Sequence, residues 1–147
     1  MPPLNIALVA HDHCKADLLD WAERHKASLL PHQLVCTGTT GKLMQAHLGP
    51  EARVERLKSG PLGGDQQMGA RIAEGKVDLI VFLWDPMRAQ PHDVDVKALL
   101  RLSVVYNVPT ACNLATADFL LQSRCFGQYE REVKDYQHYL SRDTQNI

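Results

Sequence analysis

Short apolar runs alternate with segments of helical periodicity along this chain, and that rhythm constrains the fold more than any other feature. The clearest run, VDLIVFLW at residues 77–84, is nearly continuous in apolar character, which is typical of a strand buried on both faces of a sheet. Four more strands are predicted, at residues 5–10, 33–37, 53–57 and 108–112. The strand at 53–57 is the weakest, because only its alternation supports it.

The segments between these strands carry apolar residues at helical spacing, which predicts helices over 18–29, 42–47, 65–74, 96–104 and 115–122. Strands that alternate with helices imply βαβ units, and therefore a parallel sheet with helices on both faces. We expect one α/β domain over residues 1–147, a three-layer α/β/α, Rossmann-like (flavodoxin-like) domain with a five-stranded parallel sheet.

The end of the chain allows two structural interpretations. Tyr129, Val133, Tyr136 and Leu140 have the spacing of a helix. A short strand before a shorter final helix fits nearly as well, and the sequence does not choose between them.

Composition excludes several classes of partner. Sixteen basic residues against 17 acidic ones, with no basic run, argue against a nucleic-acid binder. The longest apolar run is far short of the ~18–20 residues that span a bilayer, and the N-terminus lacks the features of a signal peptide. Cys14, Cys36, Cys112 and Cys125 have neither metal-finger nor disulfide spacing. Free thiols suit a reducing compartment, so we expect a cytoplasmic protein without a membrane or nucleic-acid partner.

Polar and glycine-rich clusters follow each predicted strand. Ligands of open parallel sheets bind beyond the carboxyl ends of the strands, so we expect these clusters to converge at one edge. They are HDHCK at 11–15, TGTTG at 37–41, SGPLGGD at 59–65, WDP at 84–86 with PHDVD at 91–95, and Asn113, Thr116 and Asp118.

The cluster Thr37-Gly38-Thr39-Thr40-Gly41 offers hydroxyls, glycines and a predicted helix N-terminus, a combination that suits a phosphate. By itself it is equally compatible with an ordinary strand-to-helix turn capped by threonine. It lacks the P-loop spacing. A second small-residue cluster, Ser59-Gly60, and a cation, Lys15, favour the phosphate interpretation.

Acid and base groups gather at the same edge, and they suit removal of a proton α to a carbonyl. Asp65 follows two glycines near a predicted helix start, where an aspartate is usually an N-cap; His92 is equally compatible with a plain loop residue. His11, His13 and His92 offer ligands for a metallohydrolase, but no further ligand has diagnostic spacing, and we expect no metal. The candidates are Asp12, Asp65, Asp85, Asp95, His11 and His92.

These residues fall in segments that closely resemble the methylglyoxal synthase family. The resemblance runs from about residue 5 to residue 140, although after residue 126 it rests only on DYQ at 135–137. The matching segments are ALVAHDHCK at 7–15, TGTTG at 37–41, SGPLGGDQQ at 59–67, FLWDP at 82–86, PHDVDVKALLR at 91–101 and NLATAD at 113–118.

The resemblance implies a cofactor-free and metal-free lyase that converts dihydroxyacetone phosphate to methylglyoxal and inorganic phosphate. It also implies a homo-oligomer, expected to be a hexamer, with phosphate as an allosteric inhibitor. Asp65 would be the catalytic base, His92 would orient and polarise the substrate oxygens, and Asp12 and Asp95 would be further carboxylates of the site. His11 would line the site, and the phosphate would be held by Lys15, Thr37, Gly38, Thr39, Thr40, Ser59 and Gly60.

A non-catalytic domain of the same fold that senses phosphate or a nucleotide is the main alternative. Such a sensor has no need for a base and an imidazole beside its anion site, so Asp65 and His92 favour the enzyme.

Overall fold

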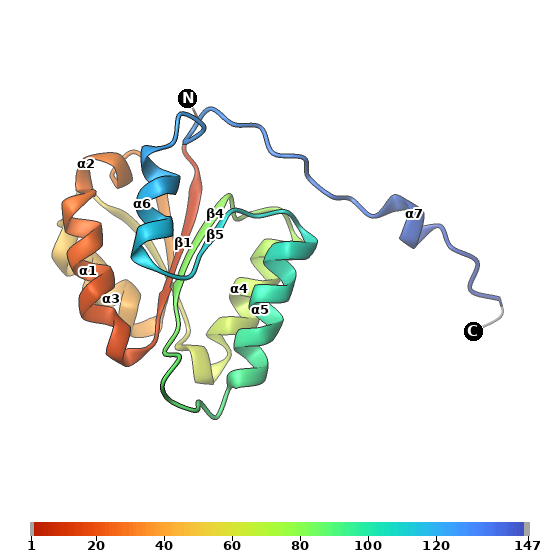
Figure 1. Ribbon diagram of the computed structural model, residues 1–147, viewed down its shortest axis with the longest axis horizontal. Helices are drawn as coiled ribbons and strands as arrows, with labels where there is room; N and C mark the ends of the chain where they lie inside the picture. Colours follow the sequence, from red (N-terminus) through yellow and green to blue (C-terminus); the bar gives the residue numbers. More distant parts are fainter. Residues whose placement is uncertain (1, 146–147) are drawn as a thin grey trace.

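A computed structural model describes residues 2–145 and contains one five-stranded parallel sheet (Figure 1). The strand order is β3-β2-β1-β4-β5, which is the order of the Rossmann fold and differs from the 2-1-3-4-5 order of flavodoxin. The five strands are β1 (Asn5–Ala10), β2 (Gln33–Thr37), β3 (Arg53–Leu57), β4 (Leu79–Leu83) and β5 (Thr110–Ala111).

The last two strands are shorter than the sequence predicts. Just before β4, Asp78 bonds Asn5 twice: its backbone N–H donates to the Asn5 carbonyl oxygen at 2.8 Å, and its carboxylate accepts the Asn5 N–H at 2.7 Å. The strand itself begins at Leu79. In β5, Pro109 has no N–H to donate, and pairing with β4 is limited to Thr110 and Ala111.

Helices cover both faces of the sheet and make the three expected layers (Figure 1). Alternate side chains of β1 enter different cores: Ile6 and Leu8 face one, while Ala7 and Val9 face the other. The first face packs on α1 (Lys15–Arg24), α2 (Lys26–Leu29), α3 (Gly38–Leu48) and α6 (Leu114–Gln122), and the second on α4 (Gly64–Ala73) and α5 (Asp93–Val105).

Three helices differ clearly from their predicted bounds. Helix α5 begins at Asp93, three residues before its predicted start at residue 96. The helix expected over 18–29 is interrupted at His25, which separates α1 from α2. Helix α3 begins at Gly38 rather than at residue 42. The threonine cluster is therefore the first turn of a helix and not a loop before it.

The chain leaves the domain after α6 as an extended arm (Figure 1). In the described part of this arm there is no strand and no long helix, only the short helix α7 (Gln137–Leu140). The Arg131 guanidinium holds the start of this arm against the domain, because it donates to the carbonyl oxygens of Val77 and Tyr106 at 3.0 and 3.3 Å. Beyond this point, residues 132–145 are almost entirely exposed.

Within residues 2–145, no helix combines the length and the apolar character needed to cross a membrane. All four cysteines are free thiols, as the sequence predicts.

Candidate functional site

A cavity of about 520 Å³ opens at the carboxyl ends of β1 to β4, the edge at which the sequence predicts a site. Ten of the twelve predicted site residues line it. They are His11, Asp12, Lys15, Thr37, Thr39, Thr40, Ser59, Gly60, Asp65 and His92. The other two, Gly38 and Asp95, lie beside the cavity and are described below.

The first turn of α3 forms one wall of the cavity. It follows β2 directly, so its free backbone N–H groups and positive helix end meet the cavity, as an anion requires. Gly38 packs against the neighbouring wall: a Cβ there would lie 2.4 Å from Ser59 Oγ. Only glycine lets the two small-residue segments approach this closely.

A cation stands at the cavity rim. Lys15, the first residue of α1, donates from Nζ to Asp12 Oδ1 at 2.6 Å, and the Asp12 side chain is 94% exposed. This hydrogen bond holds the pKa of Asp12 below its usual range. Asp12 is therefore a charged partner of Lys15 at the rim, not a buried acid.

Asp65 is the buried carboxylate of the site. It is the second residue of α4 and is only 4% exposed. Burial raises the pKa of Asp65; the nearby His92 opposes that rise, and Asp95 adds to it. A Cβ on Gly60 would lie 3.3 Å from both carboxylate oxygens, so glycine at this position leaves room for the carboxylate.

Two imidazoles face this carboxylate across the cavity. His92 Nε2 lies 3.8 Å from Asp65 Oδ2, beyond hydrogen-bond range, and the rings of His11 and His92 are 5.4 Å apart. The backbone N–H of Asp85 donates to His11 Nδ1 at 3.0 Å. In a neutral ring this leaves the proton on Nε2. Burial, and then the neighbouring His92 and Lys15, lower the pKa of His11, which favours that neutral form.

Four buried polar side-chain atoms have no hydrogen-bond partner among the described residues, and all four belong to this cavity. Buried polar groups in native proteins nearly always have partners, so such a concentration marks a place that binds a polar molecule. The atoms are His11 Nε2, Thr40 Oγ1, Asp65 Oδ2 and His92 Nδ1.

Some predicted residues lie elsewhere. Asp95 faces a groove between α4 and α5, where Gln66 Nε2 donates to it at 2.6 Å. Asn113 caps α6 by accepting the Thr116 N–H at 2.8 Å. Asp118 binds Trp21 and His25. The expectation that the cluster after β5 joins the site is therefore wrong, because these side chains fix α6 instead.

The loop between β4 and α5 contributes residues that the sequence pattern did not single out. Arg88, Ala89 and Gln90 line the cavity. The only signal in the sequence was their position after a strand end, which does not show which loop residues turn inward. Asp85 lines the cavity as well, and its Oδ1 accepts the Met87 N–H at 2.9 Å.

The histidines do not form a metal centre within residues 2–145. His11, His13 and His92 all line the cavity, but no group of three or more His, Cys, Asp or Glu side chains in the described chain is arranged to hold a metal ion. This geometry gives no support to the metallohydrolase alternative.

Comparisons with known proteins agree on one family. A family model described as MGS-like domain matches residues 17–112. The chain is 54% identical to a methylglyoxal synthase of Photorhabdus laumondii, with 93% of this chain and 90% of that protein covered. It is 56% identical to a methylglyoxal synthase of Pectobacterium atrosepticum, with 92% and 89% covered. A crystal structure of methylglyoxal synthase from Elizabethkingia anophelis superposes with a TM-score of 0.89 at 52% identity and covers 99% of this chain and 95% of that one.

Proposed function

Because this chain belongs to the methylglyoxal synthase family, we propose that its cavity carries out that family's reaction, with the roles described below. The enzyme is a carbon–oxygen lyase that converts dihydroxyacetone phosphate to methylglyoxal and inorganic phosphate. A base removes a proton from the hydroxymethyl carbon, and the electron pair forms an enediolate. The enediolate then expels phosphate, which leaves with the electron pair of its C–O bond. The product of this step is the enol of methylglyoxal, which takes a proton at its methylene carbon and loses the enol proton to give methylglyoxal.

Asp65 is the base. The observation that carries this role is a carboxylate that is 4% exposed, has a raised pKa and lacks a partner at Oδ2. A solvated carboxylate is too weak a base for a carbon acid. A desolvated and pre-positioned one loses less to reorganisation when it takes the proton.

The imidazoles act on the substrate oxygens. His11 is fixed by the Asp85 N–H as the tautomer with a proton on Nε2, and that atom has no other partner in the described chain. A neutral N–H donor of this kind stabilises negative charge where it develops on the enediolate oxygen. His92, 3.8 Å from Asp65, orients the hydroxyl and carbonyl oxygens above the base.

The phosphate binds at the first turn of α3. Its ligands are the backbone N–H groups of the residues that follow Gly38, the hydroxyls of Thr37, Thr39, Thr40 and Ser59, the backbone of Gly60 and the Lys15 ammonium. The N–H of Gly38 itself donates to the Lys58 carbonyl oxygen, so Gly38 serves by letting the turn approach Ser59. Arg88 on the opposite loop supplies a second cation at the mouth. Asp12 keeps Lys15 in place, and Asp95, held by Gln66, adds negative charge that keeps the pKa of Asp65 high.

The threonines also determine the product. Phosphate leaves readily only when its C–O bond stands out of the enediolate plane, and the α3 turn sets that angle. Substitution of Thr39 or Thr40 by alanine should weaken binding or change the ratio of phosphate loss to proton exchange. Unchanged kinetics in both variants would count against this role.

The proposal is tested by measuring phosphate and methylglyoxal release from dihydroxyacetone phosphate with EDTA present, for the native chain and for Asp65→Asn. Equal release of both products by the native chain, with a loss of about 10³-fold in the variant, is the expected result. Activity that EDTA abolishes would overturn the metal-free mechanism. Saturable phosphate binding without turnover would favour a sensor domain instead.

Assembly, inhibition and location belong to the same proposal. The exposed apolar side chains of the arm, which include Tyr129, Val133 and Leu140, support a homo-oligomer, for which we propose a hexamer. Inorganic phosphate inhibits by occupying the α3 turn, and contacts between subunits make this inhibition allosteric. Four free thiols support a cytoplasmic location.

A further inference from the structure

The geometry points to Gln67 as a positioning residue, which fixes the base Asp65 relative to the phosphate-binding segment Ser59-Gly60 by holding the backbone of Lys58. The inference rests on the role of Asp65 proposed above. Gln67 lines no part of the cavity, so its effect must pass through another residue.

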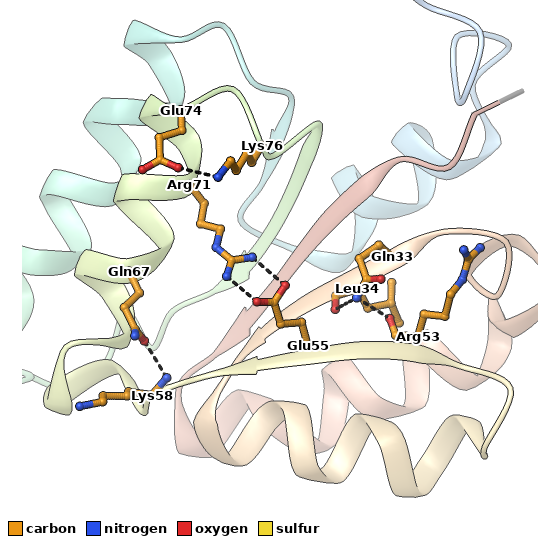
Figure 2. Close-up of polar contacts among 9 residues, drawn as sticks. All are labelled: Gln33, Leu34, Arg53, Glu55, Lys58, Gln67, Arg71, Glu74 and Lys76. Atoms are coloured by element: carbon orange, nitrogen blue, oxygen red, sulfur yellow. Dashed lines mark hydrogen bonds and ion pairs between the residues drawn. The ribbon is translucent and has the colours of Figure 1, made fainter.

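The backbone of Lys58 connects both halves of the site. Its N–H donates to Gln67 Oε1 at 2.8 Å, as Figure 2 shows, and its carbonyl oxygen accepts the N–H of Gly38 at 3.2 Å. Gln67 lies on α4 two residues after the base, and Gly38 begins the phosphate-binding helix α3. A shift of Lys58 therefore changes the distance between base and phosphate.

Close packing makes this connection stiff. A Cβ on Gly64 would lie 1.9 Å from the Lys58 carbonyl oxygen, and the Gly64 N–H donates to the carbonyl oxygen of Ser59 at 2.9 Å. Gly60 meets the Asp65 carboxylate directly. Residues 58–67 thus form a closed loop that carries both a phosphate-binding segment and the base, and among the described contacts Gln67 is the one side chain that hydrogen-bonds across it.

A second link between α4 and β3 provides a comparison. Arg71 lies four residues after Gln67, and its guanidinium forms a two-pronged ion pair with Glu55 on β3, drawn in Figure 2. Neither Arg71 nor Glu55 lines the cavity. This pair fastens the middle of the helix to the strand, whereas Gln67 fastens the end that carries the base.

Loss of the Gln67 acceptor should change the rate more than the stability. Lys58 and Gln67 are exposed, so water replaces the lost hydrogen bond and the chain still folds. The base then samples a wider range of positions, and because proton abstraction depends steeply on geometry, kcat should fall on the order of tenfold. KM should change less than about threefold, since the contacts to the phosphate remain.

The test compares Gln67→Leu, which removes the acceptor, with Gln67→Glu, which keeps one, and with Glu55→Gln, which weakens the neighbouring ion pair. Steady-state kcat and KM are measured with dihydroxyacetone phosphate, together with the isotope effect for substrate deuterated at the hydroxymethyl carbon. We expect Gln67→Leu to lose about tenfold in kcat and to show a larger isotope effect. Gln67→Glu and Glu55→Gln should stay within about threefold of the native kcat.

Three outcomes would overturn the inference: a native kcat in Gln67→Leu, equal losses in Gln67→Leu and Gln67→Glu, or an equal loss in Glu55→Gln. The last would mean that any weakening of the contact between α4 and β3 slows the enzyme. Asp65→Asn, assayed beside them, separates failure of this inference from failure of the proposed function. If that variant keeps native activity, Asp65 is not the base, and Gln67 has no base to position.

Discussion

Asp65 places a carboxylate at the wall of the cavity where it is only 4% exposed and where no donor among the described residues satisfies Oδ2. Burying a charge in this way is unfavourable for folding, and the nearby His92 and the positive N-terminal end of α4 offset only part of the penalty. The proposed role as base accounts for the arrangement, because a desolvated carboxylate takes a proton from carbon more readily than a solvated one does. The same residue therefore connects activity to stability.

Removing that charge should stabilise the fold. The pKa of Asp65 is raised in the folded chain above its ordinary value of 3.8, so its ionisation at neutral pH destabilises the folded state. We expect Asp65→Asn to raise the Tm by a few degrees at pH 7, and the gain to vanish as the pH falls toward 3.8. Differential scanning calorimetry at several pH values measures this effect.

The matched control is a carboxylate whose pKa is lowered in the folded chain, Asp118. The hydrogen bond from His25 lowers the pKa of Asp118, so its ionised form favours the fold, and Asp118→Asn should not raise the Tm. A lower Tm for Asp65→Asn than for the native chain at pH 7 would contradict the account.

The pH profile of the native enzyme should show the raised pKa of Asp65. Proton abstraction needs Asp65 ionised, and its pKa is raised, so the acidic limb of kcat/KM should lie above the range of an ordinary aspartate. Activity should rise with pH through that limb. Rates of methylglyoxal formation measured from about pH 4, near the ordinary pKa of an aspartate, up to about pH 8 locate this limb. A limb at the ordinary aspartate value would mean that the base is solvated.

At the scale of elements, the site depends on how closely α4 approaches the end of β3. Gly64→Ala places a Cβ 1.9 Å from the Lys58 carbonyl oxygen, a backbone atom that cannot move alone. We expect a loss of about 3 kcal/mol in the free energy of unfolding and a large loss of kcat. Chemical denaturation and the product assay measure the two quantities.

Gly69→Ala in the same helix is the control. A Cβ there would lie 3.1 Å from Leu102 Cδ1, the end of a flexible side chain, so stability and kcat should change little. Equal losses in the two variants would show that α4 tolerates no added methyl group. The close approach of Gly64 to Lys58 would then have no special role.

The sequence predicted the elements of the fold better than their ends. Continuous apolar runs located the central strands, because burial on both faces leaves few polar positions. The edge strand β3 is only partly buried, and its alternation alone indicated it. The start of α3 at Gly38 was missed, since two glycines and two threonines are weak helix formers and contacts with Arg56 of β3 and with Lys58 just after it fix the turn. The Rossmann strand order depends on long-range pairing that local pattern does not encode.

The candidate site was predictable where it lies at strand ends and unpredictable where it depends on side-chain direction. Asp65 and the α3 turn meet because parallel strands end at one edge. Asp118 lies after a strand too, but it turns toward Trp21 and His25. Arg88 had no motif to mark it, and its place at the cavity follows from the path of one loop.

At the scale of the whole molecule, the packing of a single domain does not explain the extended arm that follows α6. Tyr129, Val133, Tyr139 and Leu140 are each more than half exposed on a segment that leaves the domain (Figure 1). Such side chains are typical of a surface that another chain covers. The arm therefore belongs to the proposed assembly rather than to the fold of one subunit.

Removing the chain from residue 128 onward should separate assembly from folding. The deleted part contributes little to the two cores, so we expect a folded domain with native far-UV circular dichroism and a smaller molecular mass in solution. Analytical ultracentrifugation of the full and shortened chains measures the mass. An unchanged assembly in the shortened chain would assign the interface to the helices instead.

The central claim, that Asp65 removes the proton whose loss leads to phosphate elimination, is tested most directly in deuterium oxide. Proton magnetic resonance follows dihydroxyacetone phosphate with the native chain and with Asp65→Asn. The account predicts that the native chain forms methylglyoxal with solvent deuterium in its methyl group, and that the variant neither forms product nor exchanges the hydroxymethyl protons of the substrate. Exchange at the native rate in Asp65→Asn would show that another group is the base and would contradict the account.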